Sequence, residues 1–160
     1  MQNVILFDFN GVLDIKNSHE VFDHDIDYQT AKQVDPQKAA MLMRFIIEAD
    51  CEFSCISTLT RYDVDVVGGM MRTVRKVEDE KMVELVSKFQ ETFLNNYIFD
   101  FPSNGEKNQR IREYKKSNPD ANIITFEDSD PIDEEFGLIH VCSTTKLTQE
   151  NIEHAKSLLK

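Results

Sequence analysis

Side chains that could attack or hold a phosphoryl group follow the apolar stretches of this chain. Asp8 and Asn10 end the first apolar run. Hydroxyl, ammonium and carboxylate groups follow later runs, at Ser57, Thr58, Lys107, Glu127 and Asp128. In open α/β sheets, ligands bind beyond the carboxyl ends of the strands. If the apolar runs are parallel strands, we expect these side chains to meet at one edge of the sheet.

The chemistry open to this set of residues is phosphoryl transfer. The Asp8 carboxylate can attack phosphorus to form an acyl phosphate, which splits one difficult displacement into two easier ones. Charge on the phosphoryl oxygens is then stabilised by groups such as the Lys107 ammonium and the Ser57 hydroxyl. Carboxylates at Asp8, Glu127 and Asp128 repel one another and a phosphate unless a hard cation lies among them. Mg²⁺ prefers such oxygen ligands, so the sequence predicts a magnesium site.

The elements that must position these residues alternate between strands and helices. Apolar, β-prone runs predict about five strands, at 3–9, 52–56, 97–101, 122–126 and 138–142. Strands separated by helices predict an α/β fold with a parallel, doubly wound sheet, a Rossmann-like three-layer sandwich. The continuous apolarity of the first run predicts a strand covered on both faces.

Local capping signals place the helices between these strands. Asp35 followed by Pro36 predicts an N-cap with proline at the first helical position. Ser103 and Glu106 have capping-box spacing for the helix that carries Lys107. Two further helices are predicted at about 62–73 and 78–95, and a last one is capped near Thr148.

The length of the chain predicts one domain, 1–160, with 41% hydrophobic residues to fill its core. The polar stretch 14–34 is predicted to be a flap or short insertion. Two helices and a strand account for 61–102, so we expect no large cap domain. An open site of this kind suits a bulky substrate, such as a nucleic-acid end or a phosphoprotein.

The charge balance restricts the partners. The chain has 29 acidic and 18 basic residues, a formal charge of −11, which disfavours extended nucleic-acid binding. A phosphorylated small molecule or a nucleic-acid end is still a possible partner, because a metal ion can reverse the sign of the local electric field. No signal-peptide pattern and no apolar run near the roughly 20 residues of a membrane span is visible, so we expect a cytoplasmic protein without a membrane partner.

The order of these motifs resembles the haloacid dehalogenase (HAD) superfamily of phosphohydrolases. In that family the first strand ends in a DxDGT/V pattern, which corresponds here to residues 8–12, DFNGV. A Ser or Thr closes the next motif strand, here Ser57, with Thr58 and Thr60 as competing hydroxyls. A lysine, here Lys107, precedes an acidic pair.

The resemblance covers about residues 3–145 and implies a small, capless phosphohydrolase. It implies an aspartyl-phosphate on Asp8, with phosphate bound by the motif hydroxyl and lysine. The implied Mg²⁺ ligands are Asp8, the backbone carbonyl of Asn10, and Glu127 or Asp128, which the sequence does not rank.

One position departs from the family pattern. The second motif aspartate, which protonates the leaving group and later activates water, is Asn10 here. An amide cannot carry out this proton transfer. Three hypotheses follow: a phosphatase that favours good leaving groups or uses another acid, such as Asp14 or a flap residue; a binding or regulatory protein without efficient turnover; and an interaction protein that keeps the fold as a scaffold.

The Asn10 position leads to a prediction about leaving groups. Asn10→Asp restores the acid, and general acid–base catalysis contributes roughly 10²–10⁴-fold. Alkyl phosphates need the proton more than aryl phosphates, so their kcat/KM is expected to increase more. Kinetics on matched alkyl and aryl esters measure this difference. An equal increase in kcat/KM for both esters, or no increase, contradicts the hypothesis that Asn10 stands where the general acid is missing.

Overall fold

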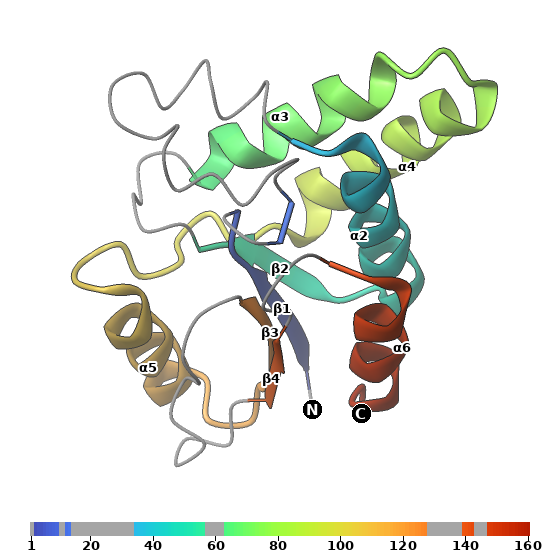
Figure 1. Cartoon of the computed structure of the whole chain (residues 1–160). Helices are drawn as coiled ribbons and strands as arrows, with labels where there is room; N and C mark the ends of the chain where they lie inside the picture. The colour runs from blue at the N-terminus through green and yellow to red at the C-terminus, as the bar shows by residue number, and fades with distance from the viewer. Residues whose placement is uncertain (1, 10–11, 14–33, 57–62, 128–138, 143–146) are drawn as a thin grey trace.

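Strand β1 (Asn3–Phe7) lies in the middle of a parallel sheet (Figure 1). It pairs on one side with β2 (Glu52–Cys55) and on the other with β3 (Asn122–Glu127). β4 (Ile139–Cys142) continues the sheet beyond β3, so the strand order is β2-β1-β3-β4. All these pairings are parallel, as the sequence predicts for a doubly wound sheet.

This computed structural model describes residues 2–9, 12–13, 34–56, 63–127, 139–142 and 147–160. The predicted flap lies almost wholly outside the described residues. So do four of the predicted site residues: Asn10, Ser57, Thr58 and Asp128.

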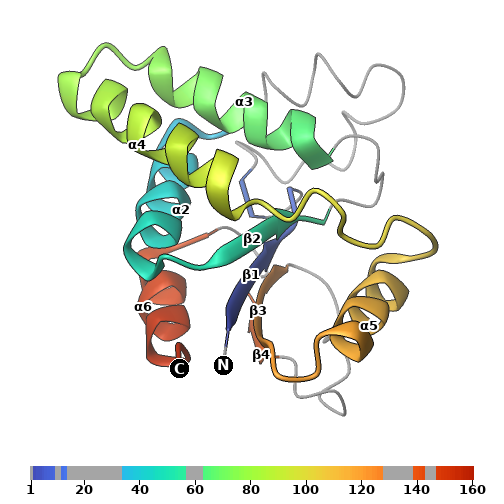
Figure 2. The same cartoon turned by 180° about the vertical axis from the view of Figure 1, so that it is seen from behind.

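Helices cover both faces of the sheet (Figures 1 and 2). The larger core receives side chains from α2 (Pro36–Ala49), α3 (Asp63–Arg75), α4 (Glu80–Asn96) and α6 (Gln149–Ser157). The smaller core receives them from α5 (Lys107–Ser117). Helices α3 and α4 therefore pack on the core at one face of the sheet.

The side chains of β1 alternate between the two cores. Ile5 and Phe7 pack in the larger core, whereas Val4 and Leu6 pack in the smaller one. All four are fully buried. Burial on both faces explains why the strand reads as a continuous apolar run, and it confirms the three-layer arrangement.

The predicted strand at 97–101 is wrong, and the described sheet has four strands rather than about five. Only an isolated parallel bridge joins Tyr97 to Phe53 of β2, supported by a 2.9 Å hydrogen bond from the Ile98 N–H to the Phe53 carbonyl. The aromatic rings that indicate a strand pack on one another instead, since the rings of Tyr97 and Phe99 lie 4.9 Å apart. Pro102, which has no N–H, follows and cannot extend a ladder.

The capping signals have mixed outcomes. Asp35 caps α2 by accepting from the Gln37 N–H, and Thr148 forms a capping box with Asn151 at α6, as predicted. The predicted capping box at Ser103 is wrong. Helix α5 begins at Lys107 with Glu106 as its N-cap residue, and no side chain caps it.

Candidate functional site at the carboxyl ends of β1 and β3

The order of the strands creates a switch point between β1 and β3. The chain runs from β1 out to β2 and returns to β3 on the other side of β1. In doubly wound sheets, ligand sites form at such a point, beyond the carboxyl ends of the strands. Asp8 directly follows β1 and Glu127 is the last residue of β3, so both flank this position.

Lys107 joins these two carboxylates. Its Nζ donates to Asp8 Oδ2 at 2.7 Å and also pairs with Glu127 Oε2. The other Asp8 oxygen, Oδ1, accepts from the Phe9 N–H at 2.7 Å. The carboxylate is therefore held in one orientation by a partner on each oxygen. The structure brings together three residues that the sequence singled out from positions far apart.

The three charged groups are withdrawn from water. Asp8 is 4% exposed, Glu127 is 1% exposed, and the Lys107 side chain is 15% exposed. Burial raises the pKa of Asp8 to about 7; the Lys107 ammonium lowers it, and the Glu127 carboxylate raises it. Burial alone lowers the pKa of Lys107, but the two carboxylates outweigh this effect and raise it. Lys107 thus stays charged while Asp8 titrates near neutral pH.

The position of Lys107 is unfavourable for the helix alone. Lys107 is the first residue of α5, where the helix dipole disfavours a positive charge. The two carboxylates offset this effect by direct pairing. A cation held against the local preference of its helix indicates that the tertiary site, rather than helix stability, determines the residue at this position.

Asp8 and Glu127 are the described residues of the site that could hold Mg²⁺. Asp8 and Glu127 offer carboxylate oxygens that converge on one ammonium, and magnesium is usually held by one or two carboxylates together with substrate oxygens. These two residues fit such an ion. Within the described ranges, no cluster of three or more His, Cys, Asp or Glu side chains is suited to a metal. The further ligands that the sequence predicts, Asn10 and Asp128, lie outside those ranges.

A second buried ion pair supports the site, and the sequence analysis missed it. Arg110, one turn after Lys107, is 2% exposed and donates from Nη2 to Asp63 Oδ2 at 2.7 Å. Its Nε donates to the Pro102 carbonyl at 2.6 Å, and its guanidinium lies over the Phe101 ring. Asp63 is the first residue of α3. Arg110 therefore ties the start of α5 to the start of α3.

The fold and the site define a parallel α/β protein with a buried Asp–Lys–Glu cluster at its topological switch point. In comparisons with known proteins, no family model, curated protein or solved structure matches this chain. Among the described helices, none has the length and apolarity needed to cross a bilayer.

The raised pKa of Asp8 predicts how stability depends on pH. The folded-state value of about 7 exceeds the ordinary 3.8, so the folded protein binds this proton more tightly and loses stability as pH rises through that window. Asp8→Asn removes the ionisable group and therefore this loss of stability. In EDTA at pH 8, the free energy of unfolding of the variant is expected to exceed that of the wild type by on the order of 1 kcal/mol. At pH 4.5 the difference is expected to be smaller.

Urea unfolding at both pH values measures this difference. The exposed Asp120→Asn serves as the control, for which we expect no such gain. An Asp8→Asn protein that is less stable than the wild type at pH 8 contradicts the prediction.

The Arg110–Asp63 pair predicts a large effect of breaking one buried ion pair. Arg110→Met removes one partner of the buried ion pair with Asp63, which typically costs about 3–5 kcal/mol of unfolding free energy. Replacing both residues, in Arg110→Met/Asp63→Leu, removes both charges of the pair and is expected to recover part of the loss. Lys88→Met breaks an exposed ion pair with Glu84 and should lower the free energy of unfolding by at most about 1 kcal/mol. Denaturant unfolding of the four proteins tests this; equal losses for Arg110→Met and Lys88→Met contradict it.

Proposed function

We propose that this protein is a magnesium-dependent phosphohydrolase that acts through an aspartyl-phosphate on Asp8. The observation that carries the proposal is the contact of Lys107 Nζ with both Asp8 and Glu127, at the switch point of the sheet. A nucleophile, a cation for phosphoryl oxygens and an acidic partner are the parts that this reaction needs. The resemblance of the motif order to the HAD superfamily supports the same activity.

The first step is displacement at phosphorus. An Asp8 oxygen forms the new bond to phosphorus, and the bond to the ester oxygen breaks, so the leaving group takes the electron pair. With Asn10 in place of an acid, the leaving group departs as an anion or receives its proton from another group. Water then attacks the acyl phosphate, which releases phosphate and restores the carboxylate.

Lys107 has two roles in this proposal. In the substrate-free protein it neutralises part of the charge of Asp8 and Glu127. When a phosphoryl group is present, its ammonium stabilises the negative charge on the transferring oxygens. The hydroxyls of Ser57 or Thr58 are proposed to bind the same oxygens.

The magnesium ion is proposed to be held by Asp8, the Asn10 carbonyl, and Glu127 or Asp128. When bound, it supplies positive charge that permits a phosphate to approach a carboxylate. This role also explains why a site with an excess of buried carboxylates accepts an anionic substrate.

The substrate class is inferred from the sequence prediction that the chain has no large cap domain. Since α3 and α4 belong to the core layer, we propose a bulky phosphorylated substrate, such as a nucleotide or a nucleic-acid end. The charge of −11 favours contact with a short end over a long footprint.

Hydrolysis of p-nitrophenyl phosphate tests the activity directly. We expect turnover with magnesium and none with EDTA. Asp8→Asn removes the nucleophile and should reduce kcat by about a thousandfold or more. Lys107→Met should reduce it by about 10²–10³-fold, the range for one lost oxyanion donor.

Lys88→Met is the matched control, because Lys88 is an exposed lysine on α4. It should retain wild-type turnover. Wild-type protein without turnover, or Asp8→Asn with full turnover, contradicts the phosphohydrolase proposal.

A second candidate function is phosphoryl binding without efficient turnover. Two observations favour it: the raised pKa of Asp8, whose protonated form is not nucleophilic, and the amide at Asn10. Beryllium fluoride with magnesium distinguishes the candidates. An adduct on Asp8 in a protein that shows no hydrolysis supports the binding function, whereas an adduct with turnover supports the enzyme.

A further inference from the structure

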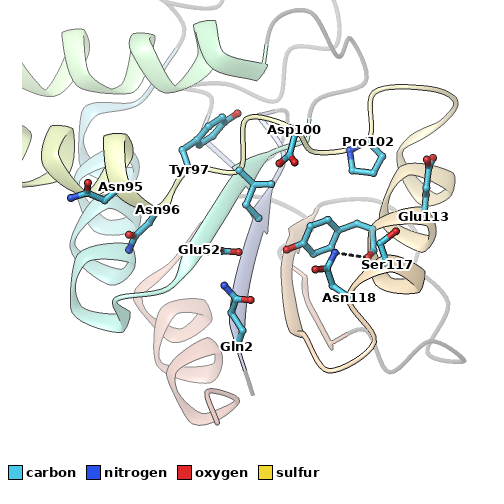
Figure 3. Close-up of a pocket in the computed structure, with 12 residues that line it drawn as sticks. Gln2, Glu52, Asn95, Asn96, Tyr97, Asp100, Pro102, Glu113, Ser117 and Asn118 are labelled. Atoms are coloured by element: carbon cyan, nitrogen blue, oxygen red, sulfur yellow. Dashed lines mark hydrogen bonds between the residues drawn. The ribbon is translucent and has the colours of Figure 1, made fainter.

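A polar cavity of about 540 Å³ lies between the end of α4, the 97–102 segment and the second half of α5 (Figure 3). Two of its lining residues lie at the amino-terminal end of the sheet: Gln2 precedes β1 and Glu52 begins β2. The Asp8 cluster, in contrast, lies at the carboxyl ends of the strands. The volume is within the range of roughly 300–1,000 Å³ that is usual for small-molecule sites.

The charged side chains that line this cavity all carry negative charge. They are Glu52, Asp100 and Glu113, and no lysine or arginine is among the described residues that line it. Asp100 and Glu113 are exposed and Glu52 is partly exposed, so solvent reaches all three. A ligand in this space therefore meets a negative potential.

The amides of the lining add hydrogen-bond acceptors. Asn118 Nδ2 donates to the Tyr114 carbonyl at 3.0 Å, and Asn96 Nδ2 donates to the Cys51 carbonyl at 3.3 Å. The oxygen atom of each side chain is a hydrogen-bond acceptor, and Asn118 Nδ2 has a second N–H beside the one that this bond uses. The cavity is thus rich in acceptors and calls for a ligand rich in N–H donors.

Two aromatic residues, Tyr97 and Tyr114, form further parts of the wall. Burial, the negative charges of Glu52 and Asp100, and a hydrogen bond with Glu52 together raise the pKa of Tyr114 to about 12. The hydroxyl therefore stays protonated and experiences the same negative field. Aromatic faces also attract organic cations and pack against methylene groups.

The carboxylates do not converge on one point. Glu52, Asp100 and Glu113 come from three separate elements and lie apart from one another (Figure 3). They form no metal-ligand cluster within the described ranges. Charges spread around a large cavity match a ligand with several separated positive charges better than a single metal ion.

We propose that this cavity binds a small linear polyamine, with its ammonium groups at Glu52, Asp100 and Glu113 and its methylene groups against Tyr114. The ammonium groups donate to carboxylate and amide oxygens. This site is separate from the proposed phosphohydrolase site, and each proposal stands or falls without the other.

Isothermal titration calorimetry with spermidine tests this proposal at low and moderate salt. We expect one site, with an affinity that falls as salt screens the charges. Asp100→Asn/Glu113→Gln removes two carboxylates at nearly constant shape. Because two exposed ion pairs with the ligand are lost, the affinity should fall about tenfold. Asn95→Asp adds an acid to the lining and should tighten binding by about threefold.

Glu78→Gln/Glu150→Gln is the matched control, since it removes two exposed carboxylates that do not line the cavity. It should change the affinity less than about twofold. An equal loss in both double variants shows general attraction to an acidic protein and overturns the proposal. So does absence of binding, or full displacement of spermidine by Mg²⁺ at equal ionic strength.

Discussion

The parallel pairing of β1 with both β2 and β3 is the constraint on which the rest of this molecule depends. It places β1 in the centre of the sheet, where every side chain from Val4 to Phe7 is buried under helices on one face or the other. The same pairing aligns the end of β1 with the end of β3, so that Asp8 and Glu127 lie together at the switch point. One hydrogen-bonded register thus organises both the cores and the candidate site.

The candidate site contains buried charged groups whose desolvation costs free energy, and the surrounding fold must offset this cost. Two carboxylates and one ammonium are withdrawn from water, and burial, with a smaller contribution from the Glu127 carboxylate, raises the pKa of Asp8 to about 7 against the opposing effect of Lys107. Removing charges from solvent is unfavourable unless geometry and hydrogen bonding are good. The Arg110–Asp63 pair fixes the start of α5 relative to α3 and so keeps Lys107 within reach. Buried groups with strongly shifted pKa values are typical of functional sites.

The two regions proposed for ligands differ in the charge that they offer. At the carboxyl ends of the strands, Lys107 provides a cation next to a candidate nucleophile. The cavity of about 540 Å³ offers carboxylates, amide and hydroxyl groups and aromatic rings, with no basic side chain among the described residues that line it. Helix α5 connects them, because its first residue reaches the Asp8 cluster and its last turns line the cavity. A single helix therefore contributes a lysine to one region and a glutamate to the other.

The sequence by itself determined four of the strands and the helices around them, the caps at Asp35 and Thr148, and the positions of Asp8 and Glu127 at strand ends. These features depend on neighbours within a few positions, so local physical chemistry is sufficient to predict them. The tertiary structure alone decided that Tyr97 makes one bridge rather than a strand, and that Arg110 pairs with Asp63. Pairing partners and packed aromatic rings are selected in space, between segments far apart in the chain. The cavity has the same origin, because its walls combine the amino-terminal end of the sheet with the end of α4, the 97–102 segment and α5.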